Sequence, residues 1–267
     1  INYDSCKSWD LIESGVKNEI NPEFIGYINK KAKEITQIDD VYFEDKKANK
    51  RFGFDHIQTA YCNQLEGAIN TGMLLQEMYK RTIEANIQVL FGVEALSMSS
   101  NAQGVIMQTN KGPIETSNCI IATNGFAKQW IEDDINPARA QIIVTNEIKN
   151  LKVKGTFHFQ KGYYYFRNIG NRILLGGGRN LDFKGETTES FETTPKIQKK
   201  LEELLRFTII PNQEFSIDYA WSGIMGVGDV KSPILKMLNK NTAVGVRLGG
   251  MGVALGSQVG KSLANYF

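Results

Sequence analysis

A glycine cluster near the end of the chain is the feature with the clearest chemical use. Gly249-Gly250-Met251-Gly252, followed by Gly256, lies between a predicted strand and the last predicted helix. Residues without side chains let a ligand approach the backbone, and the first turn of a helix offers unpaired N–H groups and partial positive charge. Such a turn can stabilise a phosphate or another negative group, or it can serve only the close packing of a helix on a strand.

The spacing of these glycines is related to a dinucleotide fingerprint. Gly250, Gly252 and Gly256 form the pattern G-x-G-x-x-x-G, whereas the fingerprint opens a strand–helix–strand unit with an acidic residue for a ribose. Only eleven residues follow Gly256, which is too few for a second strand. The cluster therefore predicts a contact with one part of a ligand and not a complete dinucleotide-binding unit.

An aromatic run in the middle of the chain is a second candidate site. In a strand, Tyr163 and Tyr165 would share one face, and Tyr164 and Phe166 the other. One face is expected to pack a core, while the other could wall a pocket. A tyrosine hydroxyl in that pocket could orient an amine.

The histidines and cysteines exclude two kinds of chemistry. His56 and His158 are the only histidines and stand in no metal-ligand spacing, so neither a zinc site nor a histidine-based catalytic triad is expected. No general base is identifiable from the sequence. Cys6, Cys62 and Cys119 include no C-x-x-C pair, which favours reduced thiols in a cytoplasmic protein.

The composition is that of an ordinary globular protein. Apolar residues make up 42% and charged residues 22% of the chain, and 31 basic and 29 acidic residues are well mixed, with a net charge of +2. These values argue against disorder and indicate no nucleic-acid partner. The apolar runs are too short to span a bilayer.

The secondary structure that must position these residues follows from periodicity and caps. Apolar residues at helical spacing predict helices at 22–35, 71–86, 195–205 and 253–266. Asn21-Pro22 and Thr194-Pro195 each supply a cap followed by proline at the first helical position. Alternating or short apolar runs predict strands at 87–91, 93–98, 105–109, 114–117, 119–122 and 242–248, with 119–122 buried, and an antiparallel set within 139–225.

Four short motifs follow one another in a particular order. They are CIIATNG at 119–125, PARAQ at 137–141, WSG at 221–223 with Asp229 and Pro233 behind it, and the glycine-rich segment 245–252. In this order, across most of the chain, they resemble the FAD-dependent oxidoreductases of the D-amino-acid oxidase, glycine oxidase and sarcosine oxidase superfamily. Four motifs in sequence are more specific than any one of them alone.

The resemblance implies an α+β protein with two discontinuous domains. An incomplete, Rossmann-like FAD-binding domain with a β-meander would comprise 67–138 and 226–267, and a substrate domain with an antiparallel sheet would comprise 1–66 and 139–225. The intact protein would oxidise a C–N bond of an amine or an N-substituted amino acid by hydride transfer to flavin. The protein itself would position the substrate and stabilise the reduced cofactor.

The resemblance also assigns positions to the cofactor. The backbone of Val93 would meet adenine. The turn beside the ADP portion would be formed by Ala122, Thr123 and Gly125. The turn beneath the isoalloxazine ring would be formed by Gly249, Gly250, Met251, Gly252 and Val253.

One part of the family pattern has no counterpart in the chain. Family members begin with a strand, a G-x-G-x-x-G motif, a helix and an acidic residue, which bind the pyrophosphate and ribose of FAD. The chain opens with Ile1-Asn2-Tyr3-Asp4, and we expect that an N-terminal part of the natural protein precedes it. The polypeptide as given is therefore expected to bind FAD weakly or not at all, and to be inactive alone.

Three further departures concern the ligands. Met251 stands where many relatives have histidine, and no cysteine lies between Trp221 and Asp229, where sarcosine oxidases link their flavin, so FAD should be held non-covalently. Met225 stands where D-amino-acid and glycine oxidases place an arginine for the substrate carboxylate, and a thioether cannot form that charge-assisted pair. Arg247 could supply a cation from another direction, or it could be a surface or strand-edge residue.

Two functions of other classes stay open. The first is a non-catalytic domain that binds a small anion at the glycine turn, and the second is a structural or assembly module whose exposed aromatic side chains face a partner. Only the oxidoreductase requires flavin, so titration with FAD, AMP and small amines separates it from the binding domain, whereas the assembly module predicts a tight oligomer on gel filtration and no response to small molecules. The sequence leaves the substrate, the electron acceptor and the oligomeric state open.

Overall fold

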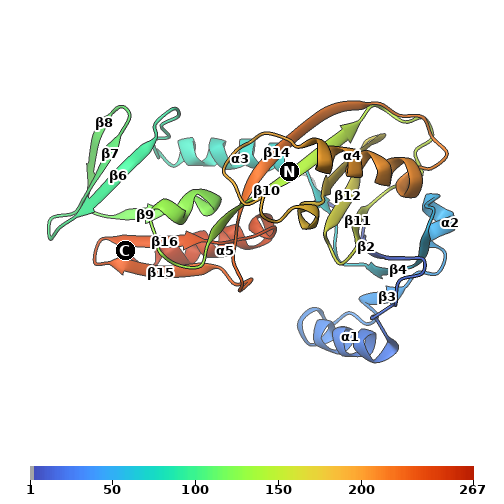
Figure 1. Ribbon diagram of the computed structural model, residues 1–267. Coiled ribbons are helices and arrows are strands. Elements are labelled where there is room, and N and C mark those ends of the chain that lie inside the picture. Colours follow the sequence, from blue (N-terminus) through green and yellow to red (C-terminus); the bar gives the residue numbers. More distant parts are fainter. Residues whose placement is uncertain (1–2) are drawn as a thin grey trace. The chain divides into compact units, whose positions relative to one another are not determined.

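The computed structural model describes residues 3–267, which divide into two compact units (Figure 1). Of the described residues, unit 1 comprises 3–70, Ala140–Glu186 and Phe191–Gly223, and unit 2 comprises Thr71–Arg139, Thr187–Ser190 and Ile224–Phe267. The predicted α+β class is confirmed, because helices occur together with several separate sheets.

The main element of unit 1 is an eight-stranded sheet of order β14-β10-β13-β12-β11-β2-β4-β3. Its strands are β2 (Ser8–Glu13), β3 (Tyr42–Glu44), β4 (Ile57–Asn63), β10 (Asn136–Thr145), β11 (Thr156–Phe159), β12 (Tyr164–Ile169), β13 (Arg172–Gly177) and β14 (Ile217–Val227). The antiparallel arrangement predicted for the middle of the chain is confirmed for β11, β12 and β13. One pair, β2 with β11, is parallel, and it joins the start of the chain to this set.

Three helices and several short elements complete unit 1. They are β1 (Tyr3–Asp4), α1 (Pro22–Thr36), α2 (Ala48–Phe52), β5 (Ala68–Ile69), a 3₁₀ turn at Arg179–Leu181, α4 (Pro195–Leu204) and a π-helical turn at Leu205–Ile209. Asn21 caps α1 as predicted, with its side chain accepting from the N–H of Phe24 at 2.8 Å. The side chain of Thr194 makes no cap hydrogen bond to α4. Its hydroxyl instead accepts from Gln141 Nε2 at 2.8 Å, so this tertiary contact replaces the predicted side-chain cap.

The core of unit 1 lies on one face of the large sheet. Trp9, Phe157 and Phe166 stack in a row, with successive ring centroids 5.2 and 4.7 Å apart. Ile197 and Leu201 of α4 are buried in the same cluster. Because side chains alternate along a strand, the residues between these aromatic side chains point to the opposite face of the sheet.

Unit 2 is built from two three-stranded sheets and two helices. Its elements are α3 (Thr71–Glu84), β6 (Ala95–Ser100), β7 (Val105–Thr109), β8 (Gly112–Thr116), β9 (Cys119–Ile121), a 3₁₀ turn at Asn124–Gln129, β15 (Ile234–Asn239), β16 (Thr242–Val246) and α5 (Gly252–Ala264). The predicted meander is β6-β7-β8, and β16 pairs parallel with β9 and antiparallel with β15. Within 3–267, every helix falls short of the length or the apolar content needed to cross a bilayer.

Three sequence predictions in these elements are wrong. Residues 87–91 form no strand, and Phe91 is 77% exposed; hydrophobicity alone cannot pair a strand, and no strand of the described chain lies beside this segment. The segment 119–122 does form a strand, β9 (Cys119–Ile121), and Ile121 is buried as predicted, but Ile120, whose side chain points to the opposite face, is 43% exposed, so the strand is buried on one face only. Tyr163 precedes β12 and lies in a turn, so it does not share a strand face with Tyr165.

Candidate functional site

The glycine cluster forms an open turn between β16 and α5. The backbone turns at Arg247 and Gly249, which have φ angles of 63° and 54°. Two hydrogen bonds hold the turn, from the N–H of Gly249 to the carbonyl of Gly226 at 3.0 Å and from the N–H of Met251 to the carbonyl of Leu248 at 2.9 Å. A Cβ atom on Gly249 would meet no described atom within 4 Å. The backbone is therefore accessible to a ligand.

The first turn of α5 offers hydrogen-bond donors beside this open backbone. Met251 is the N-cap residue and makes no side-chain cap bond. The N–H groups of Gly250, Gly252 and Val253 donate to no residue in the described part of the chain. Three free donors and the positive end of a thirteen-residue helix suit a negatively polarised group. A flavin ring with its carbonyl oxygens is such a group, so these residues fit that part of FAD.

Asn124 joins the turn after β9 to the glycine turn within unit 2. Its side-chain oxygen accepts from the N–H of Leu248 at 3.1 Å, and its own φ is 43°. Asparagine tolerates this left-handed backbone better than most residues. Packing around it is tight, because a Cβ on Gly226 would lie 2.8 Å from the same oxygen, and one on Gly125 would lie 2.8 Å from the carbonyl oxygen of Met225. The structure thus brings together the predicted residues Ala122–Gly125 and Gly249–Val253, and sequence reasoning missed Asn124.

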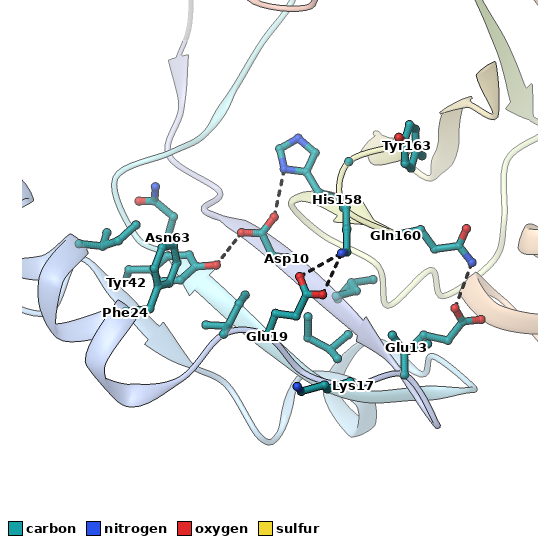
Figure 2. Close-up of a pocket in the computed structure, with 17 residues that line it drawn as sticks. Asp10, Glu13, Lys17, Glu19, Phe24, Tyr42, Asn63, His158, Gln160 and Tyr163 are labelled. Carbon is teal, nitrogen blue, oxygen red and sulfur yellow. Dashed lines mark hydrogen bonds and ion pairs between the residues drawn. The ribbon is translucent and has the colours of Figure 1, made fainter. Parts of the chain in front are cut away.

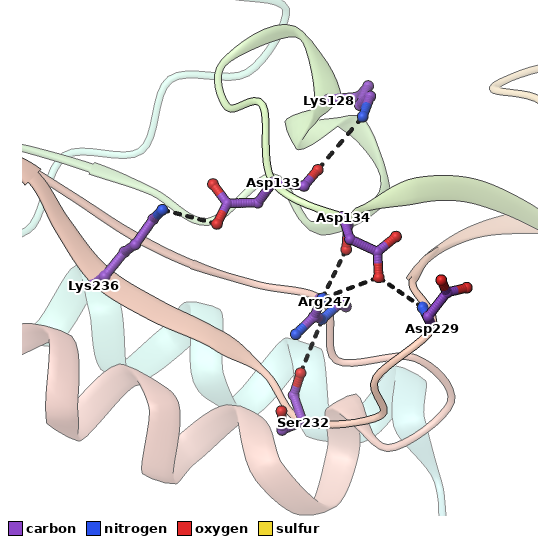
Figure 3. A network of polar contacts seen from close by, with 7 residues as sticks. All are labelled: Lys128, Asp133, Asp134, Asp229, Ser232, Lys236 and Arg247. Carbon is purple, nitrogen blue, oxygen red and sulfur yellow. Dashed lines mark hydrogen bonds and ion pairs between the residues drawn. The ribbon is translucent and has the colours of Figure 1, made fainter.

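Arg247, which directly precedes the glycine turn, binds Asp134 and Ser232 through its side chain (Figure 3). Its Nε donates to the carbonyl of Ser232 at 3.0 Å, and Nη1 donates to the carbonyl of Asp134 at 2.8 Å and lies 3.4 Å from its carboxylate. The same carboxylate accepts from the N–H of Asp229 at 2.7 Å. The side chain of Arg247 is only 12% exposed. These contacts commit two of its nitrogens to holding the protein chain in place.

Val93 lies in a loop that presents its backbone. The side chain of Asn110 accepts from the N–H of Glu94 at 3.0 Å and donates to the carbonyl of Gly92 at 3.3 Å. The N–H of Asn110 also donates to the carbonyl of Glu94 at 3.1 Å. Both neighbours of Val93 are therefore fixed, while its own N–H and C=O have no hydrogen-bond partner among residues 3–267. The hydrogen-bonding edge of an adenine ring can pair with one N–H donor and one C=O acceptor, and the backbone of Val93 offers one of each.

The remaining predicted residues fall in different units. Tyr163 and Tyr165 belong to unit 1, and Met225 and Arg247 belong to unit 2. The ring of Tyr165 lies over Gly176, where a Cβ would come within 2.7 Å of it. Burial raises the pKa of Tyr165, so its hydroxyl keeps its proton at neutral pH. Tyr163 is 45% exposed.

A polar row that the sequence did not reveal crosses the second face of the sheet; Figure 2 shows two of its members, Asp10 and His158, together with Tyr42. Tyr61, Asp10, His158 and Tyr165 are successive cross-strand partners on β4, β2, β11 and β12. His158 Nδ1 lies 3.3 Å from Asp10 Oδ1, and the Tyr42 hydroxyl donates to Asp10 Oδ2 at 2.7 Å. His158 stands in no recognisable motif, so the sequence did not indicate that it belongs to a site. Only the strand pairing joins Asp10 and His158, which are far apart in the chain.

The electrostatics of this row favour a charged histidine. The hydrogen bond with Asp10 raises the pKa of His158 above its ordinary value and outweighs burial. Burial alone would raise the pKa of Asp10, but hydrogen bonds from His158 and Tyr42 prevail and lower it. Burial and the hydrogen bond to Asp10 raise the pKa of Tyr42. At neutral pH the cluster therefore combines a carboxylate, a neutral phenol and a histidine with increased cationic character.

Comparison with known proteins adds a family and a set of similar folds. Residues 23–266 match the family model described as DAO, FAD dependent oxidoreductase. None of the curated proteins compared with the chain matches it. Similar solved structures are L-proline dehydrogenase from P. horikoshii (16% identity, TM-score 0.76, covering 99% of this chain and 72% of that chain), glycine oxidase from Geobacillus kaustophilus (14%, 0.78, 99% and 71%) and iminodiacetate oxidase from Chelativorans sp. BNC1 (16%, 0.76, 99% and 72%). At these identities the structures establish a shared fold.

Proposed function

The chain belongs to the family of FAD dependent oxidoreductases, and from that premise we propose that it serves the oxidation of a C–N bond in an amine or an N-substituted amino acid. FAD, held non-covalently, supplies the hydride acceptor when it is bound. The names of the similar structures include two oxidases, of glycine and of iminodiacetate, and a dehydrogenase of L-proline, which supports an amino acid or amine as the substrate class.

The observation that supports this proposal most directly is the open turn Gly249–Val253. The free N–H groups of Gly250, Gly252 and Val253 would hold the pyrimidine side of the flavin, and the positive end of α5 would favour negative charge there. Asn124 and Arg247 would keep the turn in this shape through their hydrogen bonds.

The other end of the cofactor would bind at a second place in unit 2. We assign the adenine to the N–H and C=O of Val93. The side chain of Asn110 binds the backbone of Gly92 and Glu94 on either side and leaves these two groups of Val93 free. Ala122, Thr123 and Gly125 would line the ADP portion between these two contacts. Unit 2 would thus be the FAD-binding domain.

Unit 1 would be the substrate domain in this scheme. The hydroxyl of Tyr165, protonated and on the polar face of the sheet, is the stronger candidate for orienting a substrate amine, because Tyr163 lies in an exposed turn. Met225 supplies no cation for a carboxylate. A plain amino acid held as in glycine oxidase is therefore not the substrate we propose.

A flavin titration tests the turn. We expect Gly250→Val to weaken FAD binding by about tenfold, because branched carbons would occupy the space over the turn. Gly260→Val, on the exposed side of α5, is the matched control and should bind FAD as the unchanged protein does. Binding is measured from FAD fluorescence with FAD in excess. Equal binding by both variants would contradict the assignment of the turn.

A second readout tests the redox function itself. In protein that has been shown to bind FAD, and without oxygen, we expect an N-substituted amino acid or an amine to bleach the visible absorbance of the flavin. N-methylglycine, iminodiacetate, L-proline and benzylamine form the first panel. If such flavin-loaded protein is bleached by none of a broad panel of amines, the proposed oxidation of a C–N bond is wrong.

We also propose a cytoplasmic location. Cys6, Cys62 and Cys119 are free thiols, and burial raises the pKa of each of them. Raised pKa values keep thiols protonated and unreactive. Quantifying free thiols in protein isolated under thiol-blocking conditions would test this, and a disulfide would contradict it.

A further inference from the structure

Besides the cavity next to the polar row (Figure 2), unit 1 contains a smaller one at the margin of its hydrophobic core. Its volume is about 250 Å³, and all of its lining residues belong to unit 1. An apolar cavity of roughly 150 Å³ is large enough to hold benzene, whereas drug-sized ligands occupy pockets of roughly 300–1,000 Å³. The smaller cavity therefore has room for one ring with a small substituent.

Three segments that are distant in the chain form its walls. They are the end of α2, the loop between β10 and β11, and the residues that follow the π-helical turn. Phe52, Val153, Ile209 and Ile210 supply the apolar part of the lining, and all four also belong to the core cluster of unit 1. Because an aromatic ring and branched aliphatic side chains line this space, a flat apolar group suits it.

Backbone hydrogen bonds fix the shape of the cavity. The N–H of Asp55 donates to the carbonyl of Thr208 at 2.9 Å, which joins the end of α2 to the π-helical turn. The N–H of Ile210 donates to the carbonyl of Leu205, five residues earlier, at 2.9 Å. Such π-helical turns are rare and occur frequently at functional sites. The turn is therefore a second indication, separate from the volume, that this region binds something.

The charge of the lining is positive. Lys152 is its only charged side chain within the described chain. A Cβ atom on Gly53, which ends α2 with a φ of 78°, would lie 3.8 Å from Cδ of Lys152, so the lysine stem passes over the end of this helix. The ammonium group forms no hydrogen bond or ion pair with any residue in 3–267. Its charge is thus available to a ligand.

Two carboxamides complete the polar part of the lining. The side chains of Asn212 and Gln213 have no hydrogen-bond partner in the part of the chain that the structure describes. The acidic residues nearest to them in these segments do not line the cavity: Asp55 accepts from the N–H of His56 at 2.8 Å, and Glu214 is exposed. A negative group on a ligand would therefore meet donors and no lining carboxylate.

We propose that this cavity binds a small aromatic anion, a single ring that carries a carboxylate or a phosphate group. The ring packs against Phe52 and Ile209. Lys152 Nζ donates to the anionic group, and the carboxamides of Asn212 and Gln213 donate to it as well. None of these residues is among those proposed above for FAD or for a substrate.

Nuclear magnetic resonance of isoleucine methyl groups tests the site. The whole chain, labelled at these methyl groups, is titrated with benzoate and with phenyl phosphate, and Ile209→Val and Ile210→Val assign the two signals. We expect both signals to shift, because an aromatic ring in the cavity lies beside these side chains, and the probe that binds more tightly identifies the anionic group. The proposal is wrong if neither signal shifts at tens of millimolar probe, or if shifts are confined to Ile12, Ile20 and Ile28 of the larger cavity.

Two further compounds separate the contributions of the ring and the charge. Benzyl alcohol lacks the charge and acetate lacks the ring. We expect benzoate to bind about fivefold more tightly than benzyl alcohol, the effect of one exposed charged partner, and acetate to leave the Ile209 and Ile210 signals in place. Equal affinity for benzoate and benzyl alcohol would overturn the proposal, because no anion would then be recognised.

A matched pair of variants locates the charge. Lys152→Met keeps the stem and removes the ammonium group, so it should weaken binding of benzoate about fivefold and leave benzyl alcohol unchanged. Lys149→Met, exposed in the same loop and outside the lining, should change neither. The methyl spectra of the free variants show whether each is folded. If the two variants bind benzoate equally, the cavity does not recognise an anion through Lys152 and the proposal fails.

Discussion

The two units differ in how completely they bury their apolar side chains. Unit 1 has one continuous core, in which Trp9, Phe157 and Phe166 stack against buried residues of α4. Unit 2 has two small clusters, around Val244 and around Leu263. Its helix α3 has no buried residue, so much of its apolar surface faces outward.

The difference indicates that the two units are stabilised in different ways, unit 1 by hydrophobic packing and the loops of unit 2 by hydrogen bonds from polar side chains. In unit 1, hydrophobic burial on one sheet face holds the scaffold and leaves the other face free for polar residues and a cavity. In unit 2, side chains such as Asn124, Asn110 and Arg247 fix the loops through hydrogen bonds to backbone groups. The stability of unit 1 should therefore depend on aromatic packing, and the shape of the sites in unit 2 on single polar residues.

The largest expected effect is the loss of an aromatic ring from the core of unit 1. Phe157→Ala should lower the free energy of unfolding by about 3–5 kcal/mol, because it removes the central ring of the stack and leaves a cavity. Phe91→Ala in unit 2, where the ring is 77% exposed, should change it by no more than about 0.5 kcal/mol. Urea unfolding followed by circular dichroism measures both. Similar effects from the two variants would remove the contrast between the units.

A smaller effect is expected from the polar anchor of unit 2. Arg247→Met should destabilise unit 2 by about 1–3 kcal/mol, since the carbonyls of Ser232 and Asp134 lose their donors. Arg81→Met, which removes only an exposed pair with Glu77, should cost less than about 0.5 kcal/mol. Amide exchange of the loop residues reports the local change. If the glycine turn exchanges at the same rate in both variants, Arg247 does not hold it.

The smallest effect concerns pH and the polar face of unit 1. Because the pKa of His158 is raised above 6.5, its ion pair stabilises the fold below that pH and the contribution is lost as pH rises through the raised value. The pKa of Asp10 is lowered below 3.8, so the stability that this ion pair contributes is also lost when the pH falls through the pKa of Asp10 in the folded protein. Both side chains are about half exposed, so screening by water keeps the effect small.

Melting temperatures of matched variants test this window. Between pH 4 and pH 6.5, His158→Gln should melt about 1–3 °C below the unchanged protein, which corresponds to the free energy that a partly exposed ion pair typically contributes. The difference in melting temperature should vanish at high pH, where His158 is neutral. His56→Gln should show no such dependence. A difference that stays constant up to pH 10 would mean that packing of the imidazole, and not its charge, is responsible.

Local chemistry made several elements predictable. Asn21-Pro22 marks the start of α1, and the helical spacing of apolar residues marks α3 and α5. Caps and periodicity involve residues within one or two turns of each other, so they need no knowledge of the rest of the chain. The glycine turn was predictable for the same reason, because strand, turn and helix are adjacent in sequence.

Other features depend on contacts between distant segments. The apolar segment 87–91 suggested a strand, but a strand requires a partner, and this one has none in the described chain. Strand β15 was not predicted, although it pairs with β16 along most of its length. Thr194 was expected to cap α4, and the tertiary contact with Gln141 decided otherwise.

By itself the sequence determined where most helices begin, where the backbone is left bare by glycine, and which family the order of its motifs resembles. Tertiary structure alone decided that Asp10 and His158 meet, because a parallel pairing of β2 with β11 joins segments that no local pattern connects. It also decided that Arg247 binds Asp134 and Ser232. Caps and turns are short-range properties of the backbone, whereas side-chain partners depend on strand register and packing across the whole fold.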